Sequence, residues 1–456
     1  MISWFPTIGN TGKPRFLEIA DAIEEAIRSG ELTASQRLPP QRKMAERLGI
    51  DFTTVSRGYA EAQSRGLLDS HVGRGTFVKK QVSSAEQPDP RRVREEDLSM
   101  NLPPEPTDPD LLARMREGLQ AVSANLVPLL RYQSTTGADQ DKAAASSWLS
   151  MRGMVPRLDR VSITPGAHAT MTAILLTLAR TGDVILCEAV TYPGLRAIAG
   201  RLGLNLAGLP SDQDGILPDA LEAAIRQRAP KALYLNPTLH NPTTLTIPQA
   251  RRMEIASVLT RHHLPLIEDD AYGFIPAHAP APFATLAPEL TWHIGGLAKC
   301  IGAGLRLAYA VAPDARAALS LAQGLRAIAV MPSPLSMALA TRWIEDGTAD
   351  SIRRFVRAET AARQAIVREV LAGHEFRADP NAFNIWLKLP QGASRAESMG
   401  RMAGRRIGLM PSDAFTVEGT PDEQMRVCIG GAIDREALRA GLLFLASTLA
   451  VESWAG

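Results

Sequence analysis

A lysine, an aspartate and an arginine at fixed spacing constrain the fold of this chain more than any other feature. Asp269 closely follows a short apolar run, and Lys299 comes just after a second one, Leu290 to Ile294. Arg306 lies seven residues beyond Lys299. From Val161 to Ala312 such strand-like runs alternate with helical segments, which predicts a mostly parallel sheet covered by helices. Residues that follow the strands of such a sheet meet at its carboxyl edge, the usual ligand crevice, so we expect the three side chains there.

The chemistry of these three side chains fits one cofactor. An amine at Lys299 can form a Schiff base with the aldehyde of pyridoxal phosphate, and a carboxylate at Asp269 can pair with the pyridinium nitrogen. The planar guanidinium of Arg306 can bind the phosphate through two parallel hydrogen bonds. A lone lysine of this kind is more often an ordinary surface residue, so the hypothesis depends on the residues around it.

Three further side chains follow strand-like runs in the same way. Asn241, in an Asn-Pro turn after Ala232 to Leu235, and Tyr272, three residues beyond Asp269, could both reach the phenolic oxygen of the cofactor. Tyr192 could lay its ring on the pyridine face. Each of them alone has an ordinary explanation as a turn residue or a core aromatic, but their order along the chain favours a pocket.

From about Leu98 to the C-terminus the chain resembles the fold-type I aminotransferases of class I and II. The motifs that carry the resemblance are Pro165-Gly166-Ala167-His168, Tyr192-Pro193, Asn241-Pro242, Asp269-Asp270-Ala271-Tyr272, and Lys299 with Arg306. The resemblance implies pyridoxal phosphate as the cofactor, with a smaller C-terminal α+β lobe beside the large sheet. It implies that the helix N-terminus at Gly166, Ala167 and His168 meets the phosphate. It also implies that Tyr132 reaches the phosphate across a dimer interface and that Arg426 binds the carboxylate of a substrate or effector.

Three positions depart from that pattern. The regulatory branch of the family usually has a threonine and a serine where this chain has Gly296 and Ala298, so two hydroxyl donors to the phosphate are missing. Thr244 stands where a glycine is usual after Asn241-Pro242-Thr243. The two missing hydroxyls predict looser binding of the cofactor, whereas Thr244 bears on the conformation of the loop that carries Asn241.

The first eighty residues carry a different pattern. Apolar residues recur at helical spacing from Phe16 to Ile27, then again after Leu38-Pro39-Pro40, and a third time beyond Asp51, which is a plausible N-cap. This order predicts a helix-turn-helix, and the segment from Gly66 to Val78 is typical of a short hairpin, or wing.

From Phe16 to Val78 the chain resembles the winged helix-turn-helix of the GntR regulators, and its union with an aminotransferase-like domain resembles the MocR-type subgroup. The resemblance implies that DNA is contacted at the starts of the second and third helices and at the wing, by Arg42, Thr53, Thr54, Gly73 and Arg74. Arg57 and Arg65 could reach phosphates from the third helix. Phe52 stands where the subgroup commonly has an arginine, so a base contact there would be apolar.

Charge and composition agree with this division. Residues 42–80 hold eight Lys or Arg against four Asp or Glu, which favours a phosphate-facing surface, although a solvated face is the plainer explanation. We predict a DNA-binding domain over residues 1–80, a linker over 81–97 and a pyridoxal phosphate domain over 98–456, with its small lobe from about residue 340. The three cysteines have no metal-ligand or redox spacing, and no apolar run is long enough for a signal peptide or a membrane span. A cytoplasmic protein without a metal site is expected.

The sequence therefore favours a homodimeric transcriptional regulator that binds an operator in double-stranded DNA. Its aminotransferase-fold domain would sense pyridoxal phosphate, an amine or an amino acid through the aldimine at Lys299. An active aminotransferase with an appended DNA-binding head shares every pocket residue and is the main alternative. A domain that has lost the cofactor is a third possibility, favoured by Gly296 and Ala298.

Overall fold

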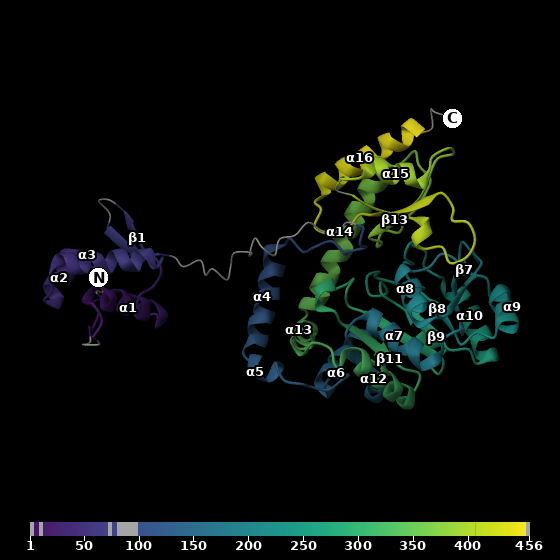
Figure 1. Cartoon of the computed structure of the whole chain (residues 1–456), viewed down its shortest axis with the longest axis horizontal. Coiled ribbons are helices and arrows are strands. Elements are labelled where there is room, and N and C mark those ends of the chain that lie inside the picture. Colours follow the sequence, from purple (N-terminus) through teal and green to yellow (C-terminus); the bar gives the residue numbers. More distant parts are fainter. Residues whose placement is uncertain (1–3, 9–11, 72–74, 80–98, 406, 453–456) are drawn as a thin grey trace. The chain divides into compact units, whose positions relative to one another are not determined.

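The structure, a computed structural model, describes residues 4–8, 12–71, 75–79, 99–405 and 407–452. The chain divides into two compact units, Met1–Glu95 and Glu96–Gly456, each described by itself below (Figure 1).

The first unit is a three-helix bundle followed by a hairpin. Its elements are α1 (Arg15–Arg28), α2 (Gln41–Leu48), α3 (Phe52–Ser64), β1 (Leu68–His71) and β2 (Gly75–Val78), the two strands being antiparallel. Gly49 ends α2 in the left-handed region at φ 65°, a conformation that glycine adopts without strain. Asp51 caps α3 by accepting a hydrogen bond from the backbone amide of Thr54 at 2.9 Å. The short turn between the two caps fixes the angle of α3 relative to α2.

The second unit is built on a seven-stranded mixed sheet. Its order is β3-β11-β10-β9-β8-β4-β5, and only β11 runs antiparallel to its neighbours. The strands are β3 (Val161–Thr164), β4 (Val184–Glu188), β5 (Asn205–Leu209), β8 (Ala232–Leu235), β9 (Leu266–Asp269), β10 (Thr291–Gly296) and β11 (Ala308–Val311). All residues of β3, β8, β9, β10 and β11 are buried, as expected of a sheet with both faces covered. This confirms the predicted fold class.

Helices cover this sheet and connect its parallel strands. They are α4 (Pro109–Ser123), α5 (Leu126–Leu129), α6 (Asp139–Ser150), α7 (Ala167–Leu178), α8 (Pro193–Leu202), α9 (Pro218–Arg228), α10 (Gln249–His262), α11 (Phe283–Leu286), α12 (Ala315–Ala329) and α13 (Pro334–Glu345). A small hairpin, β6 (Ser211–Asp212) with β7 (Gly215–Ile216), lies between β5 and α9. Among the described residues no helix combines the length and the apolar character that crossing a membrane requires.

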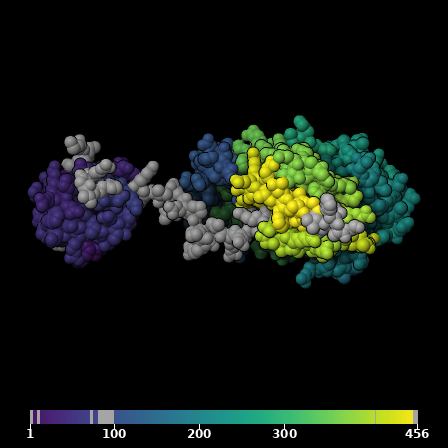
Figure 2. Space-filling model, turned by 90° about the horizontal axis from the view of Figure 1, so that it is seen from above, coloured from purple at the N-terminus to yellow at the C-terminus, as the bar shows by residue number. Residues whose placement is uncertain are grey.

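A smaller antiparallel sheet of order β12-β13-β15-β14 forms the C-terminal lobe. Its strands are β12 (Phe376–Arg377), β13 (Asn384–Lys388), β14 (Gly408–Pro411) and β15 (Gln424–Cys428), and its helices are α14 (Thr348–Val370), α15 (Arg395–Met402) and α16 (Arg435–Glu452). Leu438, Leu442 and Leu445 of α16 are fully buried in the core of this lobe. In the space-filling view the C-terminal segments, in yellow, gather on one face of the second unit (Figure 2).

Candidate functional site

The parallel register of β9 and β10 brings the predicted lysine and aspartate to the same edge of the sheet. Asp269 is the last residue of β9 and pairs with Ile294 of β10. Lys299 lies three residues beyond the end of β10, and its ammonium is among the charges that act on Asp269. Asn241 follows β8, the next strand along, in a loop whose Asn241–Pro242 bond is cis. Asn241, Asp269 and Lys299 thus lie at or beyond the ends of three neighbouring strands, at the carboxyl edge of the sheet.

Asp269 is buried and has one oxygen without a partner. Its Oδ2 accepts a hydrogen bond from the hydroxyl of Tyr234 at 2.8 Å, whereas its Oδ1 is buried and forms no hydrogen bond. Burial raises the pKa of this carboxyl to about 6. A buried acceptor without a partner is costly, and a ring N–H would satisfy it.

Lys299 is poised as a reactive amine. Burial, and then the positive charge of Arg426, lowers its pKa to about 8, so more of the amine is neutral near neutral pH than in a solvated lysine. Its Nζ donates to the backbone carbonyl of Asn101 and lies 5.9 Å from the centre of the Tyr272 ring. Tyr272 is buried, and its hydroxyl accepts a hydrogen bond from Asn101 Nδ2 at 2.9 Å.

A helix N-terminus and an arginine lie together at the predicted phosphate position. Gly166 caps α7 at φ 92°, and a Cβ at Gly166 would lie 3.2 Å from Arg306 Nη2. Ala167 and His168 form the first turn of α7, whose free amides carry a partial positive charge. Arg306 forms no ion pair with any described residue, so this cradle holds uncompensated positive charge.

Tyr192 and His168 form a pair beside that cradle. Their side chains are joined by a hydrogen bond of 2.5 Å between Nε2 and the hydroxyl, and their rings meet edge to face at 5.6 Å. Burial raises the pKa of Tyr192 to about 12. Gly194 makes this arrangement possible, because a Cβ there would lie 2.4 Å from the Tyr192 ring.

Asn241 and Arg426 connect the two lobes of the second unit. Arg426 of β15 donates from Nη1 to Asn241 Oδ1 at 2.7 Å, which leaves the amide nitrogen of Asn241 as its donor. Arg426 is 3% exposed, and its Nε is buried without a partner. Tyr132 is not brought to this pocket: it is 86% exposed, in the segment between α5 and α6.

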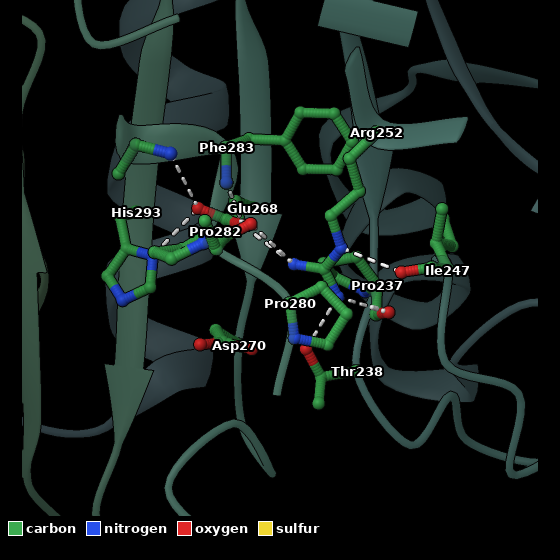
Figure 3. Close-up of polar contacts among 12 residues, drawn as sticks. Pro237, Thr238, Ile247, Arg252, Glu268, Asp270, Pro280, Pro282, Phe283 and His293 are labelled. Atoms are coloured by element: carbon green, nitrogen blue, oxygen red, sulfur yellow. Dashed lines mark hydrogen bonds and ion pairs between the residues drawn. The ribbon is translucent and has the colours of Figure 1, made fainter. Parts of the chain in front are cut away.

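A buried polar network around Arg252 and Glu268 is not predictable from the sequence (Figure 3). Arg252 of α10 is fully buried and donates to the carbonyls of Pro237 and Ile247 and to the hydroxyl of Thr238. These acceptors belong to the loop that carries Asn241. Glu268 of β9 lies 4.0 Å from the Arg252 guanidinium, and the same glutamate pairs with His293 and caps the backbone of α11. The network thereby fixes the loop against the two central strands.

The polar groups of the pocket fit pyridoxal phosphate. Asp269 Oδ1 lacks a donor, Lys299 supplies an amine, and the cradle of Gly166 and Arg306 suits a phosphate. No group of three or more His, Cys, Asp or Glu suited to a metal ion is found among the described residues.

A second candidate site lies on the first unit. Arg42 and Phe52, at the starts of α2 and α3, line with Thr76 of β2 a hollow of about 310 Å³. Thr53 and Thr54 both donate from their hydroxyls to Asp51, so they fix the start of α3. The predicted contacts Gly73 and Arg74 lie outside the described residues.

Arg57 within α3 and Arg65 just after its end differ in their contacts. Arg57 is exposed, and its guanidinium lies 4.3 Å from the centre of the Phe16 ring. Arg65 instead forms ion pairs with Asp21, Glu24 and Glu61. These ion pairs join the end of α3 to α1, and the expected contact of Arg65 with a DNA phosphate stays a prediction.

Two family models match the chain. Residues 96–442 match "Aminotransferase class I and II", and residues 16–78 match "Bacterial regulatory proteins, gntR family". The HTH-type transcriptional regulator YdeF of Bacillus subtilis (strain 168) is 28% identical over 449 residues, 97% of this chain and 96% of YdeF. The vitamin B6 salvage pathway transcriptional repressor PtsJ of Salmonella typhimurium (strain LT2) is 28% identical over 379 residues, 82% of this chain and 85% of PtsJ.

The solved structures agree on the fold of the second unit. LysN, an α-aminoadipate aminotransferase from Thermus thermophilus in complex with N-(5'-phosphopyridoxyl)-L-leucine, matches with a TM-score of 0.70 at 23% identity. The match covers 79% of this chain and 93% of LysN. It establishes the aminotransferase fold.

Proposed function

We propose that this chain is a MocR-type transcriptional regulator whose pyridoxal phosphate pocket controls its binding to DNA. The chain belongs to the aminotransferase class I and II family, and it joins to that domain a DNA-binding domain of the bacterial gntR regulators. The observation that carries the proposal is a pocket with an unpartnered buried carboxylate oxygen, on Asp269, in the same chain as a helix-turn-helix. The repressor PtsJ, named for vitamin B6 salvage, supports a link between this architecture and the cofactor.

Bound pyridoxal phosphate supplies an aldehyde that bonds covalently to an amine, that of Lys299 or of an effector. The residues of this chain position it. Asp269 would accept a hydrogen bond from the protonated ring nitrogen, and Asn241 and Tyr272 would hydrogen-bond the phenolic oxygen. Tyr192 covers the ring face.

The remaining contacts hold the phosphate and the effector. Arg306 and the first amides of α7, from Gly166 to His168, would hold the phosphate. The partner's Tyr132 completes this site in a homodimer, which agrees with the exposure of Tyr132 in one copy. Arg426 faces an effector carboxylate.

On the first unit Arg42 and the wing bind DNA phosphates and base edges, with Thr53 and Thr54 at the start of α3 and Arg57 farther along it. Two such heads in a dimer fit an operator with two half-sites. An effector can change DNA affinity only if it binds one conformation of the dimer better than the other.

Turnover separates a regulator from an active aminotransferase. A regulator needs to bind its amine but not to complete a transamination cycle, and a phosphate site without hydroxyls at Gly296 and Ala298 fits that lighter demand. We expect amino-donor turnover far below ordinary enzyme rates of roughly 1 to 1,000 per second.

Absorbance spectroscopy tests the cofactor assignment. Purified protein mixed with pyridoxal phosphate should develop a visible band, and borohydride should fix one pyridoxyl group on the peptide that contains Lys299. Lys299→Ala should lose both, whereas Lys231→Ala, at an exposed position just before β8, should keep them. A visible band and a borohydride-fixed pyridoxyl group that both persist in Lys299→Ala would contradict the assignment.

A further inference from the structure

The segment Ser99–Pro104, near the start of the second unit, contacts the residues of the pocket. Asn101 is 4% exposed, and its amide donates to the Tyr272 hydroxyl at 2.9 Å and to Asn384 Oδ1 at 3.0 Å. Farther along, Pro103 accepts a hydrogen bond from the backbone amide of Gly431 at 3.2 Å. The segment is therefore packed against both lobes.

Two of its backbone carbonyls contact the groups that the cofactor and effector need. Asn101 accepts a hydrogen bond from Lys299 Nζ, and Ser99 accepts one from Arg426 Nη2 at 2.5 Å. Arg426 Nη1 is engaged by Asn241 at the same time. The amine and the guanidinium that define the pocket thus hold this chain's own backbone.

The C-terminal lobe has a notch shaped for this segment. A Cβ at Gly430 would lie 1.7 Å from the carbonyl oxygen of Leu102. No side chain fits in that space, so glycine is required for the segment to lie as it does. The segment therefore packs directly against the backbone of the C-terminal lobe at Gly430.

The two carbonyl contacts are weaker than those that would replace them. A neutral carbonyl is a poorer partner for a guanidinium than a carboxylate, because a carboxylate adds the attraction of its own charge and can accept two parallel hydrogen bonds. Lys299 as an ammonium has three donors, and it loses most of them when its nitrogen bonds to an aldehyde. Cofactor binding therefore loosens the contact at Asn101, and a carboxylate competes for the contact at Ser99.

From this competition we infer that Ser99–Asn101 occupies the effector site when no effector is bound. Only an effector with a carboxylate displaces this segment from Arg426. The effector class is then amino acids and not simple amines. The inference rests on the proposed function and narrows it. Residues 16–78, the DNA-binding part, precede this segment in the same chain. The segment that is released is therefore covalently connected to the DNA-binding unit.

A spin label on Met100 reports the position of the segment. Met100 is 55% exposed, whereas Cys187, Cys300 and Cys428 are buried, so Met100→Cys provides one accessible thiol in the full-length protein. Gln227→Cys, on the exposed face of α9, is the control position, and labelled wild type gives the background.

The probes are pyridoxal phosphate with matched pairs that differ only in the carboxylate: L-leucine and isopentylamine, L-phenylalanine and phenethylamine, L-lysine and cadaverine. Cofactor absorbance reports amine binding, and the nitroxide spectrum reports release. We expect at least one amino acid to shift the absorbance and to mobilise the label at position 100 but not at 227, while its amine shifts the absorbance alone. Equal mobilisation by the amine, or no amino acid that acts on the label, overturns the inference.

Gly430→Ala tests the notch without any effector. The added methyl should expel Leu102, so the label at position 100 should be mobile from the start. The amino-acid concentration that gives half of the change in cofactor absorbance should fall by about tenfold, because the segment no longer competes with the amino acid; this corresponds to about 1.4 kcal/mol. Gly373→Ala, where no atom lies within 4 Å of the added Cβ, should change neither quantity.

The controls separate this inference from the proposed function. If Gly430→Ala does not fold, Asn101→Ala, which loses the side-chain bonds to Tyr272 and Asn384, takes its place with the same expectation. A cofactor band at Lys299 together with an unresponsive label refutes the internal competitor and leaves the cofactor assignment intact. The absence of any cofactor band in wild type refutes the proposed function itself.

Discussion

Asp269 of the second unit is buried, Lys299 is partly buried, and both have shifted pKa values, whereas Arg42 and Thr53 of the first unit are exposed at the starts of their helices. The pocket holds ionisable groups out of water, and the fold must support them with further buried contacts. The DNA-facing surface needs no such support, since its cations act on phosphates through water-exposed contacts. The buried pocket therefore depends on the whole fold of the second unit, whereas the DNA-facing surface depends on a few exposed side chains.

The comparison predicts that the support behind the pocket is the most sensitive part of the chain. Arg252→Ala should lower the free energy of unfolding of the second unit by about 3–5 kcal/mol, because it removes the buried arginine beside Glu268 and leaves the acceptors of the loop without their donor. Urea unfolding measures this. Arg261→Ala on the same helix removes an exposed ion pair with Glu222 and should cost much less. Equal losses for the two variants would show that the network is not what supports the loop of Asn241.

Overfilling the pocket wall should act on the cofactor more than on the fold. Gly194→Ala places a methyl group 2.4 Å from Tyr192 and 2.6 Å from His168, so both side chains must move. We expect pyridoxal phosphate to bind at least about tenfold more weakly, within the 1–3 kcal/mol typical of overpacking. Gly200→Ala, on the same helix with no atom within 4 Å, should bind it as wild type does in a fluorescence titration.

On the exposed surface the expected effects are smaller and depend on salt. Arg42→Ala should weaken operator binding and reduce the slope of log affinity against log salt by about one for each head. Arg28→Ala, an equal change of charge at the end of α1, should leave the slope unchanged, as measured by fluorescence anisotropy at several salt concentrations. A slope unaffected by Arg42→Ala would exclude a phosphate contact at this position.

The smallest predicted effect is a shift along the pH scale. Burial lowers the pKa of Lys299 to about 8, and the amine attacks an aldehyde only in its neutral form. The rate of covalent attachment of pyridoxal phosphate should therefore rise with pH and reach half its plateau near pH 8, as stopped-flow absorbance would record. A midpoint near the ordinary lysine value of 10.5 would show that the amine is solvated.

The sequence predicts well those features that depend on local order. Asp269 and Lys299 are recognisable because each follows a short apolar strand, and the cap at Asp51 is encoded within four residues. Gly296 stands where the regulatory branch of the family usually has a threonine. The structure offers no steric reason for the glycine, since the nearest atom to an added Cβ is 3.7 Å away.

Features that depend on distant packing were not predictable in this way. Asn101 reaches Tyr272 from 171 positions away in the chain, and nothing in its local sequence marks it as a pocket residue. Arg252 resembles any arginine of an amphipathic helix until the loop at Pro237 folds over it. The ion pairs of Arg65 with Asp21 and Glu24 on α1 could not be predicted, because both carboxylates lie more than forty residues earlier in the chain.

Operator binding measured in the presence and absence of pocket ligands tests the central claim most directly. Fluorescence anisotropy with DNA from upstream of the protein's own gene would compare wild type and Lys299→Ala, without additions, with pyridoxal phosphate, and with pyridoxal phosphate plus the amino-acid panel. The account predicts that at least one condition changes the affinity of wild type by about fivefold or more, the scale of an ordinary coupling free energy, and leaves that of Lys299→Ala unchanged. An affinity that is the same in every condition, or that changes equally in Lys299→Ala, would contradict it.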